Sequence, residues 1–510
     1  MLVEIPEQPE QPTRSLPRGE VKLRLVDRAQ ITMAPIYVEE LIPADHKARA
    51  IWDLVGRMDL SRFLEPLRTA RGCPGRPAWD PHLLVSVWVY AYSEGISSAR
   101  EIERVMQWEP GMQWLGGLVA INHHTLSDFR VEHKAALDEL FAQLLALLET
   151  EGLVSLEQVM HDGTKIRTQA GGDSFRREKT LRQRLEEARQ VVAQMGEPEA
   201  EAPAKDRKKA ARERAARERV QRLDAALKEL TALQADKSTD DEKAGVRVSL
   251  TEPEARIMKH GDHAIAPSYN AQITTEAENK IIVGTHLSQC SSDAQSLMPA
   301  LEEVVKNLEK KPVQVVIDGG FTNRDNIIQC AAQQIDLVGS LPDPQERSAA
   351  AMKAQGIDPG FAPFRFKILE GGQQLECPAG CSLAHVRQSQ KRGDTYQQYQ
   401  ARGEDCLACR YQPQCCPRRP ERGRTVSLRV AEQPEVATFR KKMETPESRA
   451  IYRRRGEVAE FPNAWIKDKL GLRKFRVLGL VKAGSELLWA CLTYNIMQWV
   501  RLSWRKPVIA

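Results

Sequence analysis

Apolar residues recur at three- and four-residue spacing between residues 45 and 150, a pattern typical of amphipathic helices. The clearest runs are residues 51–58 and 83–91, and Asp80-Pro81 forms a helix start before the second. Two shorter helical segments, 97–103 and 122–130, carry polar faces. A helix, a turn and a polar-faced helix suit a module that reads DNA, and an ordinary helical bundle fits the same pattern.

A different pattern begins after residue 150, where short β-rich runs alternate with helical spacing. The apolar run 154–161 predicts a strand that ends at Asp162, because Gly163 follows as a break. Further strands are expected at 269–275, 281–288, 312–318 and 336–341, and helices at 293–309 and 326–334. This order predicts an α/β fold in which helices pack on a mixed sheet.

Two long segments interrupt that alternation. Residues 173–241 are rich in Arg, Glu, Ala and Leu, with a break around residues 196–198, which predicts a coiled-coil-like insertion of two antiparallel helices. Residues 343–437 are rich in Gly, Gln, Arg and Cys. Helical spacing returns at 445–470, and a last helix is expected at 482–502.

The composition and the distribution of charge indicate what kind of partner the protein binds. A chain of 510 residues with 42% hydrophobic and 28% charged residues has the composition of a globular protein of several domains. The net charge of +5 is small, but residues 205–222 hold nine Lys or Arg against three Asp or Glu. Further basic clusters lie at 452–455 and 473–476. Such local patches are typical of proteins that bind a polyanion.

Neither end of the sequence predicts export or membrane insertion. Residues 1–14 are rich in Glu, Pro and Gln without an apolar core, unlike a signal peptide. The apolar stretch 486–502 contains Glu486, Gln498 and Arg501 and is too short to span a bilayer. We therefore expect a buried amphipathic helix there and a cytoplasmic protein.

These patterns divide the chain into five predicted parts. They are an extended tail (1–44), a helical DNA-binding domain (45–150), a catalytic α/β domain (151–172, 246–342 and 440–510), a charged helical insertion (173–245) and a zinc-ribbon-like, Cys-rich insertion (343–439).

Two aspartates stand in matching surroundings. Asp162 and Asp318 each follow an apolar strand and precede glycine, so both are expected at the carboxyl edge of the sheet. Paired carboxylates suit Mg²⁺, and two such ions can activate an attacking hydroxyl and stabilise the leaving oxygen of a phosphodiester. The competing interpretation of each Asp-Gly pair is a simple turn.

A third acid lies within residues 452–467, where Tyr452, Arg455, Glu460 and Lys467 resemble the Tyr-Arg-Glu-Lys signature of bacterial insertion-sequence transposases. These enzymes have a DDE active site on an RNase H-like fold. The resemblance extends over nearly the whole chain, including the helical N-terminus, both insertions and the strand entry at 267–272.

The resemblance implies roles for individual residues. Asp162, Asp318 and Glu460 would bind two Mg²⁺ or Mn²⁺ ions, and Tyr452, Arg455 and Lys467 would contact the DNA terminus. On a helix Glu460 and Lys467 share a face, as do Tyr452 and Arg455. Pro462 would bend or restart that helix just after Glu460, which leaves Glu457 as the rival third acid.

Six of the ten cysteines fall within forty residues, and the chain has no predicted export signal, so metal binding is preferred over disulfides. The Cys-x3-Cys and Cys-x2-Cys spacings are typical of a structural zinc site. The expected ligands are Cys377, Cys406 and Cys409 with either Cys381 or Cys415. Reduced thiols without a metal are the alternative.

Together these features predict a DNA transposase that binds terminal inverted repeats, cleaves double-stranded DNA and transfers the 3′ end, as a homodimer in the bacterial nucleoid. Residues 45–150 would recognise the ends and residues 205–222 would add affinity independent of sequence. The alternatives are an RNase H-like nuclease without strand transfer and a DNA-binding or scaffold protein with vestigial acids. The candidate end contacts are Arg100, Arg104, His123, His124 and Arg130.

Overall fold

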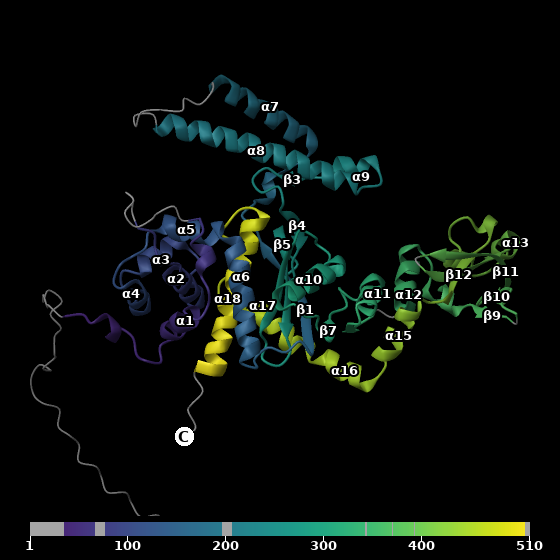
Figure 1. Cartoon of the computed structure of the whole chain (residues 1–510). Coiled ribbons are helices and arrows are strands. Elements are labelled where there is room, and N and C mark those ends of the chain that lie inside the picture. The colour runs from purple at the N-terminus through teal and green to yellow at the C-terminus, as the bar shows by residue number, and fades with distance from the viewer. Residues whose placement is uncertain are drawn as a thin grey trace, which may run out of the picture.

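The computed structural model describes residues 35–66, 77–195, 207–341, 344–369, 371–391 and 393–504. A mixed sheet forms the centre of the molecule (Figure 1). The N-terminal helices lie on one side of this sheet, a helical hairpin lies above it, and a second sheet lies at the far end. The α/β class expected from the sequence is confirmed at this level.

The central sheet has the strand order β4-β5-β1-β7-β8, and β6 pairs with β5. Strand β1 pairs antiparallel with β5 and parallel with β7, and β7 pairs parallel with β8. The parallel half therefore begins at β1. The strands are β1 (Gln158–Arg167), β4 (Arg256–Lys259), β5 (Ile265–Glu276), β6 (Ile282–Ser288), β7 (Gln314–Ile317) and β8 (Asp336–Gly339).

The prediction that the first strand ends at Asp162 is wrong. Strand β1 begins at Gln158 and continues through Asp162 to Arg167, because the long strand β5 supplies backbone partners along its whole length. Gly163 does not break the strand. Its missing side chain leaves room for Asp293, since a Cβ at Gly163 would lie 2.8 Å from Asp293 Oδ1.

Helices α10 (Leu297–Leu308) and α11 (Arg324–Ala332) follow the order expected from the sequence. Helix α10 packs against β5 and β6, and α11 packs against β8. The C-terminal part adds α15 (Pro434–Met443), α16 (Pro446–Arg453), a π-helical turn, η9 (Gly456–Glu460), and α17 (Phe461–Asp468). The turn η9 contacts both β1 and β5, which brings this segment onto the strand that carries Asp162.

The last helix, α18 (Leu480–Trp499), joins the N-terminal helices to the sheet. It packs against α2, α5 and α6 on one side and against β6 on the other, so the amphipathic helix expected here is buried on nearly every face. Asn495 fixes its position, because the side chain accepts from Ile282 N at 2.9 Å and donates to Ile282 O at 2.7 Å. No helix in the described part of the chain is long and apolar enough to cross a membrane.

The N-terminal helical unit begins before residue 45, because Ile42 is buried in its core and Glu39 pairs with Arg49 at 2.7 Å. Residues 1–34 of the expected tail lie outside the described residues. The helices of this unit are α1 (Lys47–Val55), α2 (Pro81–Ser93), α3 (Ala99–Val105), α4 (Pro110–Gly116), α5 (His123–Glu132) and α6 (Lys134–Thr150).

Arg130, expected to contact DNA, is a core residue, and that expectation is corrected. Its side chain is 6% exposed and lies 3.6 Å from the fully buried carboxylate of Glu486 on α18. It also donates to Ser97 O at 2.8 Å and lies over the Trp88 ring. The position on a polar-faced helix suggested exposure, but nothing in the local sequence indicates that α18 covers this face.

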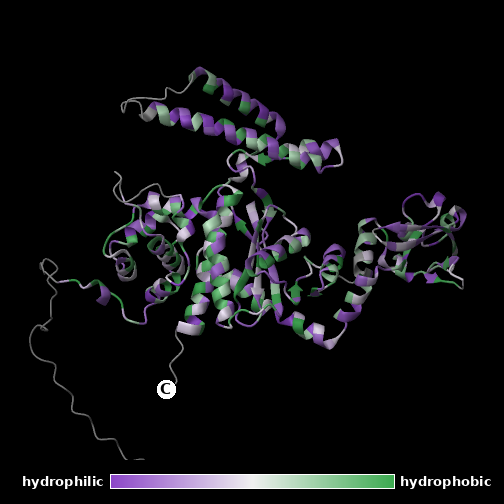
Figure 2. Ribbon diagram, in the orientation of Figure 1, coloured by the Kyte–Doolittle hydropathy of each residue, from purple (hydrophilic) through white to green (hydrophobic). Residues whose placement is uncertain are grey.

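The charged insertion forms the predicted pair of antiparallel helices, α7 (Glu178–Met195) and α8 (Arg207–Ala235), followed by the short α9 (Asp240–Gly245). Its residues are mostly hydrophilic (Figure 2). A narrow apolar seam holds the two helices together: Leu181, Leu185, Ala188, Leu223, Ala226 and Leu230. The expected turn at 196–198 lies outside the described residues.

The Cys-rich insertion contains a five-stranded antiparallel sheet of order β13-β12-β11-β10-β9 that the sequence did not predict. Its two longest strands, residues 382–391 and 394–401, are rich in polar residues. The first is largely exposed and the second is partly buried, and neither has a clear hydrophobic alternation. The strands are β9 (Lys367–Ile368), β10 (Gln374–Glu376), β11 (Ser382–Lys391), β12 (Asp394–Ala401) and β13 (Thr425–Ala431).

Removing one partner of the Arg130–Glu486 pair should leave an uncompensated buried charge. We expect Arg130→Ala to lower the free energy of unfolding by about 3 kcal/mol, and exposed Arg100→Ala to change it by less than about 0.5 kcal/mol. Urea denaturation followed by circular dichroism measures both. A stable Arg130→Ala protein that has lost DNA binding would restore Arg130 as a DNA contact.

Candidate active site

The register of β1 and β7 sets Asp162 beside Asp318. The two strands pair in parallel up to Met160 and Val316, and each acid lies two residues further along its own strand direction. The two carboxylates therefore face the same edge of the sheet. Burial raises the pKa of Asp162 to about 6, the nearby Arg455 opposes that shift, and the charge of Asp318 adds to it.

Residues from the C-terminal helices contact Asp162 directly. Asn463 on α17 donates from Nδ2 to Asp162 Oδ2 at 3.1 Å, and Arg455 Nη1 lies 4.0 Å from Asp162 Oδ1. Lys467 lies nearby: burial and Arg473 lower its pKa, whereas Asp162 opposes this shift. Asp162 is thus surrounded by donors and cations from a segment about 300 residues away in sequence.

Arg455 connects Glu460 to Asp162, because its Nη2 lies 3.7 Å from Glu460 Oε1 while its Nη1 lies near Asp162. In an ordinary α-helix, residues five apart point in different directions. The turn η9 is π-helical, and its i→i+5 hydrogen bonding brings Arg455 and Glu460 above one another. Pro462 lies in the first turn of α17, so the helix restarts after Glu460 as the sequence suggested.

The rival acid Glu457 is exposed and has no ion pair among the described residues. Its neighbours Val458 and Ala459 are buried against Met160, Val316 and Val338 of the sheet. The geometry therefore favours Glu460 over Glu457 as the third acid.

Asp318 is held by the turn that follows β7. Its Oδ1 accepts from Gly320 N at 2.8 Å and from Phe321 N at 3.3 Å. A Cβ at Gly320 would lie 3.1 Å from this oxygen and 3.7 Å from Asp293 Oδ2. The second glycine after the acid therefore allows a tight turn between two carboxylates.

The sequence analysis missed two residues of this region, Asn463 and Asp293. Asn463 lies one helical turn after Glu460, and that spacing was the only available signal. Asp293 precedes α10 and accepts from Asn270 Nδ2 at 2.7 Å and from Gln272 Nε2 at 3.2 Å. Only the pairing of β5 with β1 brings these amides and Asp293 next to Gly163.

Among the described residues, no three His, Cys, Asp or Glu side chains converge closely enough to hold a metal ion in this conformation. Asp162 and Asp318 nevertheless fit a divalent cation, because they are adjacent carboxylates and the nearby Arg455 does not offset the effect of burial on the pKa of Asp162. The Oδ1 atom of Asn463 beside them is buried and lacks a hydrogen-bond partner. Glu460 has a side chain 66% exposed and is turned toward Arg455, so only its rotation would complete the triad.

The other expected DNA contact on this segment, Tyr452, packs against the apolar cluster that contains Met160 and Val316 of the two acid-bearing strands. It lines a cavity of about 390 Å³ beyond β8, together with Arg440, Arg449 and Arg453.

All six clustered cysteines line one cavity of about 30 Å³. Cys377 Sγ accepts from Cys381 N at 3.2 Å, and Cys406 Sγ accepts from Arg424 N at 3.3 Å. Cys416 instead donates to Arg418 O at 3.6 Å. Five sulfurs remain for a metal, and these are the five candidates that the sequence identified.

Burial raises the pKa of Cys415 to about 11, with further contributions from Cys416, Cys406 and Cys377. Without a cation the Cys415 thiol stays protonated at neutral pH. The donor set fits zinc, which binds thiolates and lowers their pKa.

On the N-terminal unit, Arg100 and Arg104 of α3 are exposed, as a DNA contact requires. His123 on α5 pairs with Glu103 at 2.5 Å, and His124 stacks on His123. The exposed charges of α3 and α5 are mixed, since Glu101 lies 3.7 Å from Arg104. Arg100, Arg104 and His124 are exposed, and His123 is partly exposed and paired with Glu103. These four residues do not form a strongly basic face.

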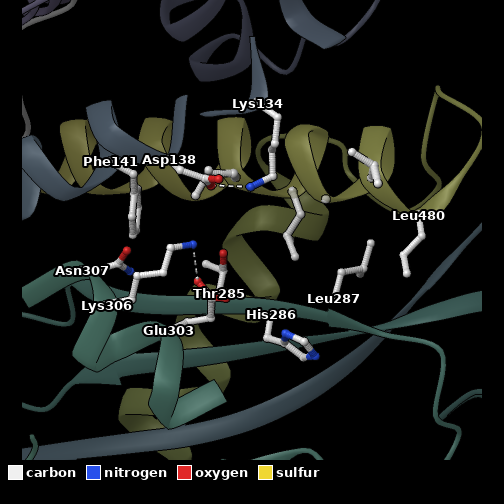
Figure 3. Close-up of a pocket in the computed structure, with 14 residues that line it drawn as sticks. Lys134, Asp138, Phe141, Thr285, His286, Leu287, Glu303, Lys306, Asn307 and Leu480 are labelled. Carbon is white, nitrogen blue, oxygen red and sulfur yellow. Dashed lines mark hydrogen bonds and ion pairs between the residues drawn. The ribbon is translucent and has the colours of Figure 1, made fainter. Parts of the chain in front are cut away.

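Another cavity, of about 200 Å³, lies between α6, α18, α10 and β6 and differs from the acidic site in its charge (Figure 3). Its charged side chains pair with one another: Lys134 with Asp138, and Lys306 with Glu303 at 3.3 Å. This neutral arrangement shows no excess charge for a phosphate or a metal, so we place the candidate site at Asp162 and Asp318.

Two regions of the chain match known protein families. Residues 376–500 match the family described as "Transposase DDE domain", and residues 36–132 match "Transposase domain (DUF772)". No curated protein matches the chain. The two matches support an insertion-sequence transposase, and the first of them includes η9 with Arg455 and Glu460.

The buried charge of Asp162 should reduce the stability of the metal-free protein. Its folded pKa of about 6 exceeds the ordinary 3.8, so the cost is absent below about pH 4 and complete above about pH 6. We expect Asp162→Asn to raise the free energy of unfolding at pH 8 by up to about 3 kcal/mol, with no gain at pH 4.

Urea denaturation in EDTA measures this difference, and Glu460→Gln is the matched control. Because Glu460 is mostly exposed, its variant should stay within about 0.5 kcal/mol of wild type. An Asp162→Asn protein less stable than wild type at pH 8 would show that the carboxylate is well compensated in the metal-free state.

Proposed function

We propose that this protein is a DDE transposase with an RNase H-like catalytic domain, which cleaves DNA at the ends of a mobile element and joins the freed 3′ end to a target. The main support for this proposal is the register of β1 and β7, which sets Asp162 beside Asp318, together with Arg455, which lies between Asp162 and Glu460. The mixed sheet supports the fold assignment, because its antiparallel β5 and β6 and its parallel β7 and β8 flank the central strand β1, which carries Asp162.

Asp162, Asp318 and Glu460 would hold two Mg²⁺ or Mn²⁺ ions. Such ions supply a polarised nucleophile and stabilise the leaving oxygen during phosphodiester cleavage. The residues of this chain would prepare the site: Asn463 orients one carboxylate through its hydrogen bond, and Arg455 neutralises the acids before the ions bind. If Glu460 served as a metal ligand instead of pairing with Arg455, the guanidinium of Arg455 would be free of that ion pair and could bind a phosphate of the substrate.

Double-stranded DNA is the proposed partner. Lys467 lies beside Asp162, and Lys165 and Arg167 of β1 are near enough, with Lys467, to lower the pKa of His260, although burial is the larger cause. Of this cluster, Lys467 is close enough to Asp162 for the two charges to interact, and a DNA backbone would meet positive charge there. Tyr452 would contact the DNA from the separate cavity beyond β8. Two element ends require two active sites, which supports a homodimer in the synaptic complex.

We also propose one structural zinc in the Cys-rich insertion. The cavity lined by Cys377, Cys381, Cys406, Cys409 and Cys415 lies at the edge of a sheet with a small apolar core. A closed four-sulfur site would stabilise that sheet, as structural zinc does in domains of this size.

Neutralising each acid should abolish cleavage without removing DNA binding. Asp162→Asn, Asp318→Asn and Glu460→Gln each remove a metal ligand with little change of shape, so we expect a loss of at least about 10³-fold in cleavage and strand transfer. A labelled element-end duplex with a plasmid target measures both steps, and gel shift measures binding.

Glu457→Gln is the control on the same turn and should retain near wild-type activity. Full activity of Glu460→Gln together with an inactive Glu457→Gln protein would assign the third acid to Glu457. Cleavage without any joining to the plasmid would instead indicate a nuclease that lacks strand transfer.

Elemental analysis of protein purified without chelator should find about one zinc per chain, because structural sites bind it tightly. Cys377→Ser and Cys409→Ser should lose the metal, whereas Cys416→Ser, whose sulfur donates to a backbone carbonyl, should retain it. Less than about half an equivalent in the wild-type protein would contradict the proposal.

A further inference from the structure

Three arginines meet in a notch between the helical hairpin and the strand that follows it. Arg184 of α7 and Arg219 and Arg222 of α8 line an open cavity of about 180 Å³, together with Leu223, Leu250 and Thr251. In liquid water this volume would hold about six molecules, which is enough for a phosphate group. We call this cavity the arginine notch.

The arginine notch carries charge that its surroundings do not neutralise. Within the described part of the chain, none of its three arginines takes part in an ion pair, and no carboxylate lines the cavity. Other arginines of the hairpin do have partners: Arg182 lies 2.7 Å from Glu178, and Arg189 lies 2.9 Å from Asp224. All three side chains are exposed, so water and salt screen their mutual repulsion. The notch therefore offers an anion three cations without a competing carboxylate.

Buried contacts connect the arginine notch to the central sheet. Thr251 precedes Glu252, a buried carboxylate that accepts from Tyr269 OH at 3.0 Å and from Gly479 N at 3.1 Å. Arg256 on β4 also pairs with Glu229 of α8. These contacts tie the foot of the hairpin to β5 and to the start of α18. An anion held in the notch would therefore have a defined position relative to the catalytic sheet.

The charge extends beyond the notch along α8. Lys209 and Arg212 are exposed, and Arg212 shares the helix face of Arg219 because the two are seven residues apart. From Lys209 to Arg222 the helix rises about 20 Å, the axial length of about six base pairs. A stripe of this length suits an extended polyanion better than a small anion.

We propose that the arginine notch binds a backbone phosphate of duplex DNA and is the principal contact of the helical insertion with DNA. This proposal rests on DNA as the partner under the proposed function, but it does not depend on the catalytic acids. Arginine is suited to the contact, because its planar guanidinium can donate two hydrogen bonds to one phosphate. Contacts of this kind are indifferent to base sequence.

The test compares two triple variants of the full chain that lose equal charge. The notch variant is Arg184→Ala/Arg219→Ala/Arg222→Ala. The control is Lys179→Ala/Arg214→Ala/Lys228→Ala, which removes three exposed cations of the same two helices that lie outside the notch. Alanine is a strong helix former, so both hairpins should fold, and circular dichroism checks this.

Binding to a random-sequence duplex is measured by fluorescence anisotropy in EDTA over a range of salt concentrations. We expect the notch variant to bind about tenfold more weakly at 0.1 M salt, with a salt slope reduced by about one to two, since each phosphate contact contributes about 0.9. The control should bind within about threefold of wild type.

Equal losses in the two variants would show diffuse attraction by the whole hairpin and overturn the notch as a site. Unchanged binding in both would show that the hairpin does not contact DNA. Because no divalent ion is present, either result is separate from failure of the catalytic proposal, which the cleavage assay of the acid variants reports.

Discussion

The parallel pairing of β1 with β7 is the constraint on which the proposed site depends. It aligns Asp162 with Asp318 at the sheet edge, where burial opposes ionisation of Asp162. Nearby cations are needed to stabilise the ionised form of two close, partly buried carboxylates. In this structure Arg455 supplies part of that charge, with Lys467 nearby. The arrangement is thus stable enough to fold yet poorly compensated, as a metal-binding site must be before it is loaded.

The C-terminal segment connects this site to the rest of the molecule. Its π-helical turn sets Arg455 and Glu460 above one another and lies on β1. Some twenty residues later, α18 fills the space between the N-terminal helices and the sheet, fixed by Asn495 and by the pairing of Glu486 with Arg130. The unit proposed to recognise DNA and the unit proposed to cut it therefore share one buried helix, and neither is free to move independently of α18.

The sequence predicted those parts of the fold that local patterns encode. The strand before Asp318 is short, apolar and bounded by turn residues, and the apolar seam of the hairpin repeats with helical spacing, so both were found. Strand β1 was ended too early, because polar residues such as Thr164 and Lys165 pair through their backbone with β5. Arg130 was wrongly predicted to be exposed, because Glu486 on α18, the helix that buries it, is more than 350 residues away in sequence. Asn463 and Asp293 become recognisable only when tertiary packing brings them to the acids. The polar strands of the second sheet, such as residues 382–391 and 394–401, lack a clear alternating pattern.

The central claim, that Asp162 and Asp318 form a divalent-cation site, is tested most directly by Mn²⁺ binding to the full chain, measured by electron paramagnetic resonance of the free ion. The account predicts that the wild-type protein binds Mn²⁺ and that Asp162→Asn and Asp318→Asn each weaken this binding by at least about tenfold, a loss of about 1.4 kcal/mol. Binding that is equally tight in wild type and both variants would contradict it.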